Sequence, residues 1–254
     1  MRHGYHLFAL IQTDIIDSAP LPPGLEEGEL TLLPAGPVTA VAQLVSDDFT
    51  ARLQQGNMAE TERDWLTAQL LAHERVVESF AALGPLFPLG FGVLLADPLT
   101  LQAAIAPHTA TLSGFFKRAA GRQEWSLKFF IREQAPKRGQ MAQAARSGLE
   151  YLTARNAVPE RAAAQEAAGR AFVEQALARL SRFFEDIVSN KTGAAPAKDL
   201  RLLANIALLV PETAQTEFVE AIQALVEPAD SEGIELTLTG PWPLYSFRPA
   251  ITLG

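Results

Sequence analysis

The hydrophobic pattern of this chain changes twice from strand-like runs to long helical runs, and this limits the possible folds more than any other feature. Residues 5–12, YHLFALIQ, are typical of a buried strand, and two further β-prone runs follow before the pattern becomes helical at Asp47. Near Glu124 the progression starts again with an alternating run, EWSLKFFIRE. The sequence therefore predicts an α+β fold with two domains and a boundary near residue 121.

An apolar stripe predicts one long helix in the first half of the chain. Its members advance by 4, 3, 4 and 3 residues: Leu66, Leu70, His73, Val77 and Phe80. A strand-like run, PLFPLGFGVLL, comes after this helix. Pro88 predicts an edge position or a bulge for that run, because proline has no N–H to donate within a sheet. Asp97 and Pro98 are typical of the start of a further helix, which Gly121 is expected to end.

The second half of the chain predicts a different order of elements. Its first strand places four apolar side chains on one face: Trp125, Leu127, Phe129 and Ile131. Two helical segments follow, over roughly 136–156 and 159–191, and the buried side of the second is marked by Phe172, Ala176, Leu180, Phe183 and Ile187. A strand (LRLLANIALLV), a helix and a strand (GIELTLTG) complete the order β-αα-β-α-β, which is close to a ferredoxin-like plan. We therefore predict domains 1–121 and 122–239 and an extended tail, 240–254.

Composition excludes several classes of protein. Apolar residues make up 48% and charged residues 20%, which is typical of a globular chain. No apolar run reaches the roughly 18 residues that a membrane span requires, and the first residues read as a strand rather than a signal peptide. The absence of cysteine excludes disulfides, thiolate metal sites and a cysteine nucleophile. A net charge of −8 argues against nucleic acid as a partner.

None of the familiar catalytic and metal-binding motifs that we considered is complete in this sequence. His73 and Glu74 begin a zinc-protease motif, but Val77 stands where the second histidine ligand belongs, so we expect a buried, hydrogen-bonded His73. His3 and His6 read as two histidines at a strand end, on opposite faces. No P-loop and no serine nucleophile motif occur. We therefore predict no catalytic residue, no cofactor and no metal site.

The stretch GPWPLYSF, residues 240–247, concentrates aromatic side chains in a segment that can form neither a helix nor a central strand. Two interpretations remain open. The tail folds back over its own sheet as a strap, or it docks on another subunit, where aromatic side chains and arginine serve as anchors. The candidate interaction surface consists of Trp242, Pro243, Tyr245, Phe247 and Arg248.

Four segments together carry a resemblance to a known family. They are YHLFAL at 5–10, HERVVE at 73–78 with GPLFPLGFG at 84–92, EWSLK at 124–128, and GPWPLYSF at 240–247. The last is the most specific, because a Gly-Pro-Trp-Pro-x-Tyr-x-Phe ending is unusual. The chain resembles the GvpL/GvpF family of gas vesicle proteins and, within it, the GvpF members. It departs from them at Gly90, where relatives commonly have arginine before Phe-Gly.

The resemblance implies an accessory protein of gas vesicle formation that is not an enzyme and needs no cofactor. It also implies two α+β domains. The implied partners are the major shell protein and other gas vesicle proteins, without nucleic acid or a lipid membrane. The implied location is the gas vesicle in the cytoplasm, and the gas-facing surface is one candidate side of the wall. Two alternatives stay open: a ligand-sensing ferredoxin-like regulatory module, and an enzyme whose motif is not recognisable.

Overall fold

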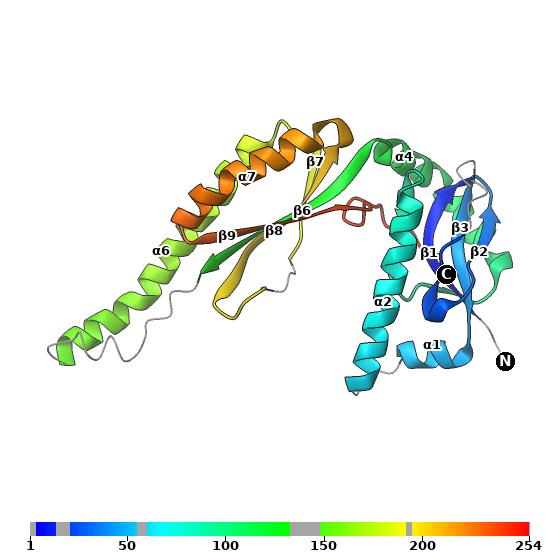
Figure 1. The fold of residues 1–254 in the computed structure, drawn as a ribbon, viewed down its shortest axis with the longest axis horizontal. Helices are drawn as coiled ribbons and strands as arrows, with labels where there is room; N and C mark the ends of the chain where they lie inside the picture. Colours follow the sequence, from blue (N-terminus) through cyan, green and yellow to red (C-terminus); the bar gives the residue numbers. More distant parts are fainter. Residues whose placement is uncertain (1–3, 14–20, 55–59, 133–147, 192–194, 254) are drawn as a thin grey trace. The chain divides into compact units, whose positions relative to one another are not determined.

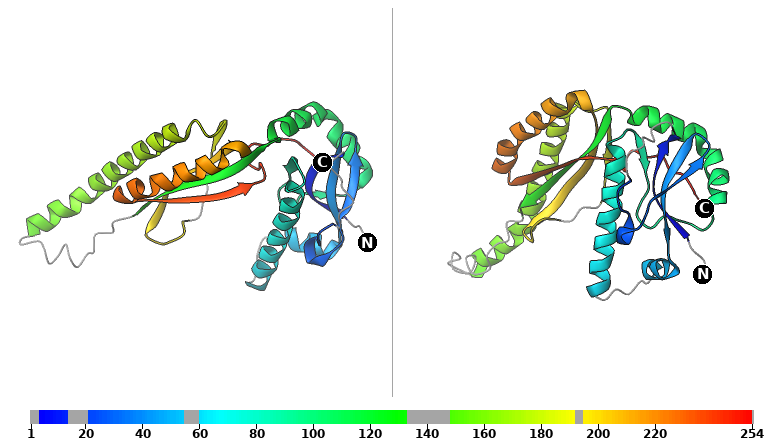
Figure 2. Two further views of the ribbon diagram at one scale, coloured as in Figure 1. Left: turned by 45° about the horizontal axis from the view of Figure 1, so that its top comes forward. Right: turned by 45° about the vertical axis from the view of Figure 1, so that its right-hand side comes forward.

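The protein folds into an α+β structure with two separate β-sheets (Figures 1 and 2). The computed structural model describes residues 4–13, 21–54, 60–132, 148–191 and 195–253, without the side chains of 148–161. The chain divides into two compact units. Unit 1 consists of Met1–Gln123 and Trp242–Gly254, and unit 2 consists of Glu124–Pro241.

The sheet of unit 1 is built around β1 (Gly4–Gln12). β3 (Val38–Val45) pairs with one side of β1, and β2 (Thr31–Ala35) lies outside β3. β4 (Leu86–Pro88) and the short β5 (Leu94–Leu95) also pair with β1. All of these pairings are antiparallel. Because β1 lies in the interior, Leu7–Ile11 are at most 2% exposed, which confirms the buried strand predicted from YHLFALIQ.

Helices cover both faces of this sheet. Leu86 belongs to an apolar cluster with Val76 and Phe80 of α2 (Glu60–Ala81). The next residue, Phe87, points to the opposite face, where its ring centroid lies 4.9 Å from that of Phe115 in α4 (Thr109–Ala119). β4 is at the edge of the sheet and ends at Pro88, as the proline predicts.

The buried face of α2 differs in part from the predicted stripe. His73, Val77 and Phe80 are buried as expected, but Leu66 is half-buried and Leu70 is 43% exposed. The helix instead buries the row Gln69, Ala72, His73, Val76, Val77 and Phe80. Gln69 takes the position facing the core because its Oε1 accepts the backbone N–H of Glu26, at 3.0 Å. This hydrogen bond accounts for a polar side chain on the buried face, which apolar side chains alone do not indicate.

The helix predicted from Asp97 is broken into parts. Its start is confirmed, since the Asp97 carboxylate accepts the backbone N–H of Leu99 at 2.9 Å. A 3-10 turn at Pro98–Thr100, the short α3 (Leu101–Ile105) and another 3-10 turn at Ala106–His108 precede α4. Pro107 lies in the second turn, where a ring without an N–H cannot continue an α-helix. α1 (Asp47–Gln54) is a separate short helix before α2.

Unit 2 contains a four-stranded sheet in the order β7-β8-β6-β9. Along the chain, its elements are β6 (Arg122–Arg132), α6 (Gly148–Leu180), β7 (Asp186–Ser189), β8 (Leu200–Pro211), α7 (Gln215–Ser231) and β9 (Ile234–Trp242). The predicted alternation of β6 is confirmed for Trp125, Leu127 and Phe129, which share one cluster with residues of α6 and α7. Ile131, the fourth residue of the predicted face, is buried but is not a member of that cluster. The predicted strand at LRLLANIALLV is β8.

Two predictions for α6 are wrong. The helix runs without a break through Pro159, so the two predicted segments form one helix where they are described; residues 133–147 lie outside the described residues. The helix ends at Leu180 rather than near residue 191, and the chain then forms β7. Ile187 is therefore 41% exposed in a strand, paired with Leu208, instead of lying on a buried helical face. The element order of unit 2 is accordingly β-α-β-β-α-β.

Candidate functional site

Two buried histidines hold the turn that follows β4. His6 of β1 and His73 of α2 are fully buried. The Nε2 atom of His73 lies 3.1 Å from the carbonyl oxygen of Leu89, and it must be the donor because a carbonyl can only accept. The backbone N–H of Gly92 donates to Nε2 of His6, also at 3.1 Å. The turn at 89–92 is thus fixed to a strand and a helix that are distant in sequence.

Both histidines are neutral at physiological pH. Burial lowers the pKa of His6 to about 3, and the neighbouring His73 lowers it further. Burial lowers the pKa of His73 to about 4, partly offset by its hydrogen bond to Leu89. His73 is a buried, hydrogen-bonded histidine, as predicted, whereas His6 is a core residue and not a strand-end histidine. Its position within β1, where Leu94 of β5 is its partner, accounts for this difference. His3 lies outside the described residues.

Two side chains of the tail, Tyr245 and Arg248, make polar contacts with the rest of unit 1. The Tyr245 hydroxyl donates to the carboxylate of Glu74 on α2, 3.1 Å and 3.2 Å from its two oxygens. Nη1 of Arg248 donates to the carbonyl oxygen of Pro88, at 2.8 Å. Leu244 and Phe247, which are next to Tyr245 and Arg248 in the chain, are buried. The tail packs on its own chain, as the strap interpretation expects, but on unit 1 and not over the sheet of β9 that it follows.

Burial influences the protonation of Glu74 and Tyr245, the two groups that form the first contact. It raises the pKa of the Glu74 carboxyl group, against the hydrogen bond from Tyr245, which lowers that pKa. Burial and the negative charge of Glu74 both raise the pKa of the Tyr245 hydroxyl. Tyr245 therefore keeps its proton and acts as a donor throughout the physiological pH range.

The second contact closes an open sheet edge. The backbone N–H of Leu89 donates to Phe8 of β1, so by alternation the backbone of Pro88 faces away from β1. Pro88 has no N–H, and its outward carbonyl is occupied by Arg248. The outer edge of β4 is therefore poorly suited to pair with another strand at this point.

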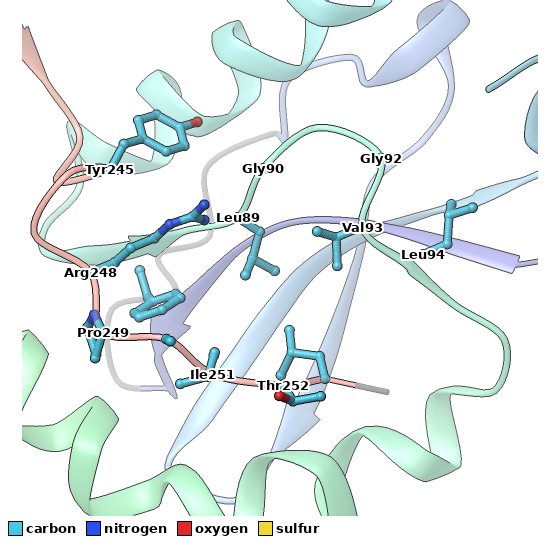
Figure 3. Close-up of a pocket in the computed structure, with 13 residues that line it drawn as sticks. Leu89, Gly90, Gly92, Val93, Leu94, Tyr245, Arg248, Pro249, Ile251 and Thr252 are labelled. Atoms are coloured by element: carbon cyan, nitrogen blue, oxygen red, sulfur yellow. The ribbon is translucent and has the colours of Figure 1, made fainter. Parts of the chain in front are cut away.

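An open pocket of about 700 Å³ lies between this turn and the tail (Figure 3). The turn side contributes Leu89, Gly90, Gly92, Val93 and Leu94, and the tail side contributes Tyr245 and residues 248–253. Figure 3 shows Arg248 reaching from the tail toward the turn, with Ile251 and Thr252 further along the tail. The lining combines apolar side chains with polar surface, and a guanidinium group lies at one end. This combination suits an amphipathic ligand with a negative charge. This pocket is called the tail slot below.

The structure distributes the predicted interaction residues unequally. Tyr245 and Arg248 line the tail slot. Pro243 and Phe247 are buried, and the guanidinium of Arg118 lies 5.6 Å from the centroid of the Phe247 ring. Trp242, at the end of β9, is 38% exposed. Sequence reasoning missed the opposite wall, for which the available signal was the pair of glycines beside Pro88, since glycine allows close approach to a backbone.

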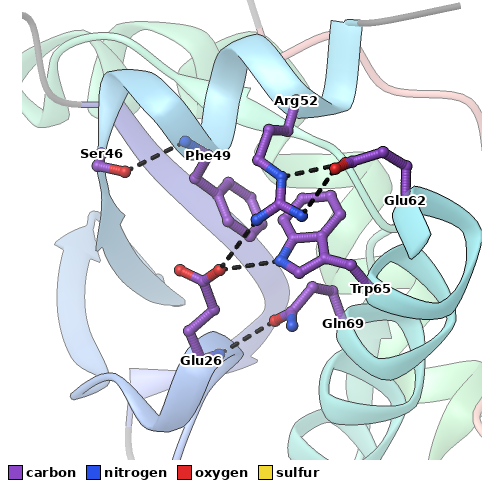
Figure 4. Close-up of polar contacts among 7 residues, drawn as sticks. All are labelled: Glu26, Ser46, Phe49, Arg52, Glu62, Trp65 and Gln69. Atoms are coloured by element: carbon purple, nitrogen blue, oxygen red, sulfur yellow. Dashed lines mark hydrogen bonds and ion pairs between the residues drawn. The ribbon is translucent and has the colours of Figure 1, made fainter. Parts of the chain in front are cut away.

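A second polar cluster in unit 1 joins α1 to α2 and the turn at Leu25–Glu27 (Figure 4). Arg52 donates to both carboxylate oxygens of Glu62, at 3.1 Å and 3.2 Å, and its guanidinium lies 3.9 Å from the centroid of the Trp65 ring. Trp65 Nε1 donates to the Glu26 carboxylate at 2.9 Å. Ser46 Oγ accepts the backbone N–H of Phe49 at the start of α1. Since these groups satisfy one another, the cluster is a structural clamp.

Within the described ranges, no group of three or more histidine and acidic side chains is placed to hold a metal ion. None of the helices in the described part of the chain is both long enough and apolar enough to cross a membrane.

The comparisons with known proteins agree on one family. The model of the family described as gas vesicle synthesis protein GvpL/GvpF matches residues 4–249. The chain belongs to this family. It is 25% identical over 195 residues to gas vesicle protein L of Streptomyces sp. (strain CB03234), an alignment that covers 72% of this chain and 70% of that protein.

Two solved structures of gas vesicle protein GvpF share the fold. The protein from Anabaena sp. PCC7120 superposes with a TM-score of 0.68 at 16% identity, over 99% of this chain and 98% of that chain. The protein from Microcystis aeruginosa gives a TM-score of 0.66 at 16% identity, over 97% of this chain and 99% of that chain. At this identity the likeness establishes an α+β architecture shared with GvpF structures.

Proposed function

We propose that this chain acts in gas vesicle formation as a non-enzymatic accessory protein that binds the apolar shell subunit before or during assembly. The observation that carries the proposal is the family match over residues 4–249. Unassembled shell subunits expose apolar surface, which aggregates unless another protein covers it. The other gas vesicle proteins are further proposed partners. The proposed location is the vesicle in the cytoplasm, with the gas-facing side of its wall as one candidate side.

The tail slot supports a binding role rather than a catalytic one. Most of its lining residues carry apolar side chains, although polar atoms make up about as much of the exposed lining as apolar atoms do. The nearby titratable pair, Tyr245 and Glu74, is engaged in a mutual hydrogen bond. The two buried histidines behind the turn are held neutral, with pKa values of about 3 and about 4, so they are poorly suited to proton transfer near pH 7.

We also propose that unit 2 is a ferredoxin-like domain. Its element order, β-α-β-β-α-β, and its sheet order, β7-β8-β6-β9, support this assignment. Such a domain hosts many functions, so the assignment by itself does not favour a ligand-sensing role. The tail slot lies in unit 1, which leaves the sensing alternative without support from unit 2.

The test is capture of the shell subunit together with removal of the gene. The purified, tagged chain is expected to retain the shell subunit of its own host, presented as a fusion to a soluble carrier, while the carrier alone is not retained. A host that lacks the gene is expected to form fewer or misshapen vesicles, and the reintroduced gene restores them. Vesicles of normal number and shape in that host, with no capture of the subunit, would overturn the proposal.

A further inference from the structure

The tail slot has two walls that are fixed independently of any ligand. The turn at 89–92 is held by the buried histidines His6 and His73. The tail is held by Tyr245 and Arg248 and, further on, by the backbone N–H of Thr252, which donates to Nε2 of His108 at 3.3 Å. A site whose walls are already positioned loses little entropy when it is filled.

One wall of the slot offers unpaired backbone. Residues 249–253 run without helix or strand structure, and none of the backbone–backbone hydrogen bonds found among the described residues involves them. The N–H of Thr252 is taken by His108 and Pro249 has no N–H, so Ala250, Ile251 and Leu253 supply the N–H groups with which another strand can pair. The opposite wall is different, because Pro88 and Arg248 block the edge of β4. An incoming strand would therefore pair along the tail.

The charge in the slot selects the chemistry of the occupant. Arg248 is exposed and gives Nη1 to a carbonyl, which leaves its other donors for further bonds. Within the described part of the chain, none of the ion pairs found joins Arg248 to a carboxylate. A guanidinium with spare donors beside walls whose side chains are mostly apolar is complementary to a carboxylate on an otherwise apolar segment.

We propose that the tail slot binds an extended apolar segment of the shell subunit, which pairs with residues 249–253 and places one acidic side chain against Arg248. This inference rests on the proposed function and adds the binding site and the form of the bound segment. The slot volume of about 700 Å³ is sufficient for several apolar side chains.

The test compares two pairs of matched variants in a binding measurement with the shell subunit fused to a soluble carrier. Gly90→Phe fills the slot: a Cβ at Gly90 has only Arg248 within 4 Å, at 3.9 Å. Gly114→Phe adds the same ring on the exposed side of α4, where a Cβ meets nothing within 4 Å. Arg248→Glu reverses the charge, and Arg248→Lys keeps it. Thermal unfolding of each variant establishes that it is folded.

We expect Gly90→Phe and Arg248→Glu to weaken binding at least tenfold, which corresponds to about 1.4 kcal/mol, while Gly114→Phe stays within about threefold of the unmodified chain. Arg248→Lys keeps the charge but has fewer donors, and it is expected to weaken binding less than Arg248→Glu does. A folded Gly90→Phe variant that binds as well as the unmodified chain would overturn the slot and leave the proposed function standing. No binding by the unmodified chain would overturn both. Self-association and binding of decanoate are measured on the same variants. If Gly90→Phe and Arg248→Glu lose either of these and still bind the shell subunit as the unmodified chain does, the proposal is overturned in favour of a second copy of this chain or a small amphipathic ligand.

Discussion

The Tyr245 hydroxyl donates to the Glu74 carboxylate at 3.1 Å and 3.2 Å from its two oxygens, and so joins two residues that are 171 positions apart. Glu74 lies on α2, and Tyr245 lies in the tail that returns to unit 1 from the end of β9. The bond explains why the terminal aromatic segment includes a tyrosine: its ring packs in part against the apolar cluster of α2 and the sheet, while its hydroxyl reaches an acceptor.

Tyr245→Phe is expected to destabilise the protein by about 1–2 kcal/mol, because it removes a hydrogen bond to a charged acceptor that is partly buried. Denaturant unfolding measures the loss. Glu74→Gln is the informative partner variant and is expected to change stability by less than about 1 kcal/mol, since it retains an oxygen that accepts from Tyr245. If the two single variants lose the same stability, and the double variant loses the sum of the two, the hydroxyl group and the carboxylate are not energetically coupled.

The sign of the Glu74 effect follows from its pKa. Because burial raises the pKa of this carboxyl group, the folded chain binds its proton more tightly than the unfolded chain does. Its contribution to stability is therefore present at acidic pH and is lost as pH rises through the folded pKa. Glu74→Gln is expected to flatten that part of the stability profile, and an unchanged profile would contradict this assignment.

The two buried histidines are expected to have the opposite effect, because they lower the stability of the protein as pH falls. Their folded pKa values of about 3 and about 4 lie below the ordinary value of 6.5, so the unfolded chain takes up protons first as pH falls. The stability contributed by each neutral histidine is present above pH 6.5 and declines below it. The loss is about 2 kcal/mol per histidine at pH 5, from about 1.4 kcal/mol per pH unit. Urea unfolding at constant ionic strength between pH 7.5 and pH 5 measures it.

Replacing one histidine isolates this effect from that of the carboxylates. His73→Gln is expected to lower stability at pH 7.5, because the bond to Leu89 and the packing against Phe8 are altered. It is also expected to reduce the slope of stability against pH between 6.5 and 5. A variant with the same slope as the unmodified chain would show that His73 does not resist protonation in the folded state.

The sequence predicted those elements whose structure is determined by residues close to them in the chain. Pro88 at an edge and the Asp97 cap are consequences of one side chain each. The phase of α2 could not be predicted, because the hydrogen bond from Glu26 to Gln69 joins positions that are 43 residues apart. β7 was missed because Ile187 follows Phe183 by four residues, a spacing that continues the helical pattern, whereas pairing with β8 decides the strand.

The tail slot lay beyond sequence reasoning for the same physical reason. Its walls meet through contacts such as that of Arg248 with Pro88, across 160 residues. The aromatic tail indicated that something is anchored there, and Tyr245 and Arg248 were among the candidates. The partner wall is made of glycine backbone and ordinary aliphatic side chains: the glycines at 90 and 92 indicate that a close approach to the backbone is possible, but not what approaches.

The contacts of Arg52 predict that arginine and lysine at position 52 give different stabilities. Arg52→Lys keeps the charge but cannot make the forked bond to Glu62 or stack over Trp65, so it is expected to cost about 1 kcal/mol or less. The estimate is modest because both side chains of the ion pair remain partly exposed. Arg52→Ala is expected to cost more, since the packing on Trp65 is also lost. Thermal unfolding in low and high salt separates the two parts, and equal stability of the variants would contradict the forked geometry.

Gly92 and Gly90, on the same turn, provide a matched test of backbone strain. Gly92 has φ of +88°, where a side chain is disfavoured, whereas Gly90 is not in that region. A Cβ at Gly92 meets no atom within 4 Å, so Gly92→Ala changes only the backbone energy and is expected to cost about 1–2 kcal/mol. Gly90→Ala is expected to be neutral or slightly stabilising, because alanine restricts the unfolded chain. Denaturant unfolding of both variants decides the matter: equal stabilities would mean that the turn held by His6 and His73 does not require a left-handed residue.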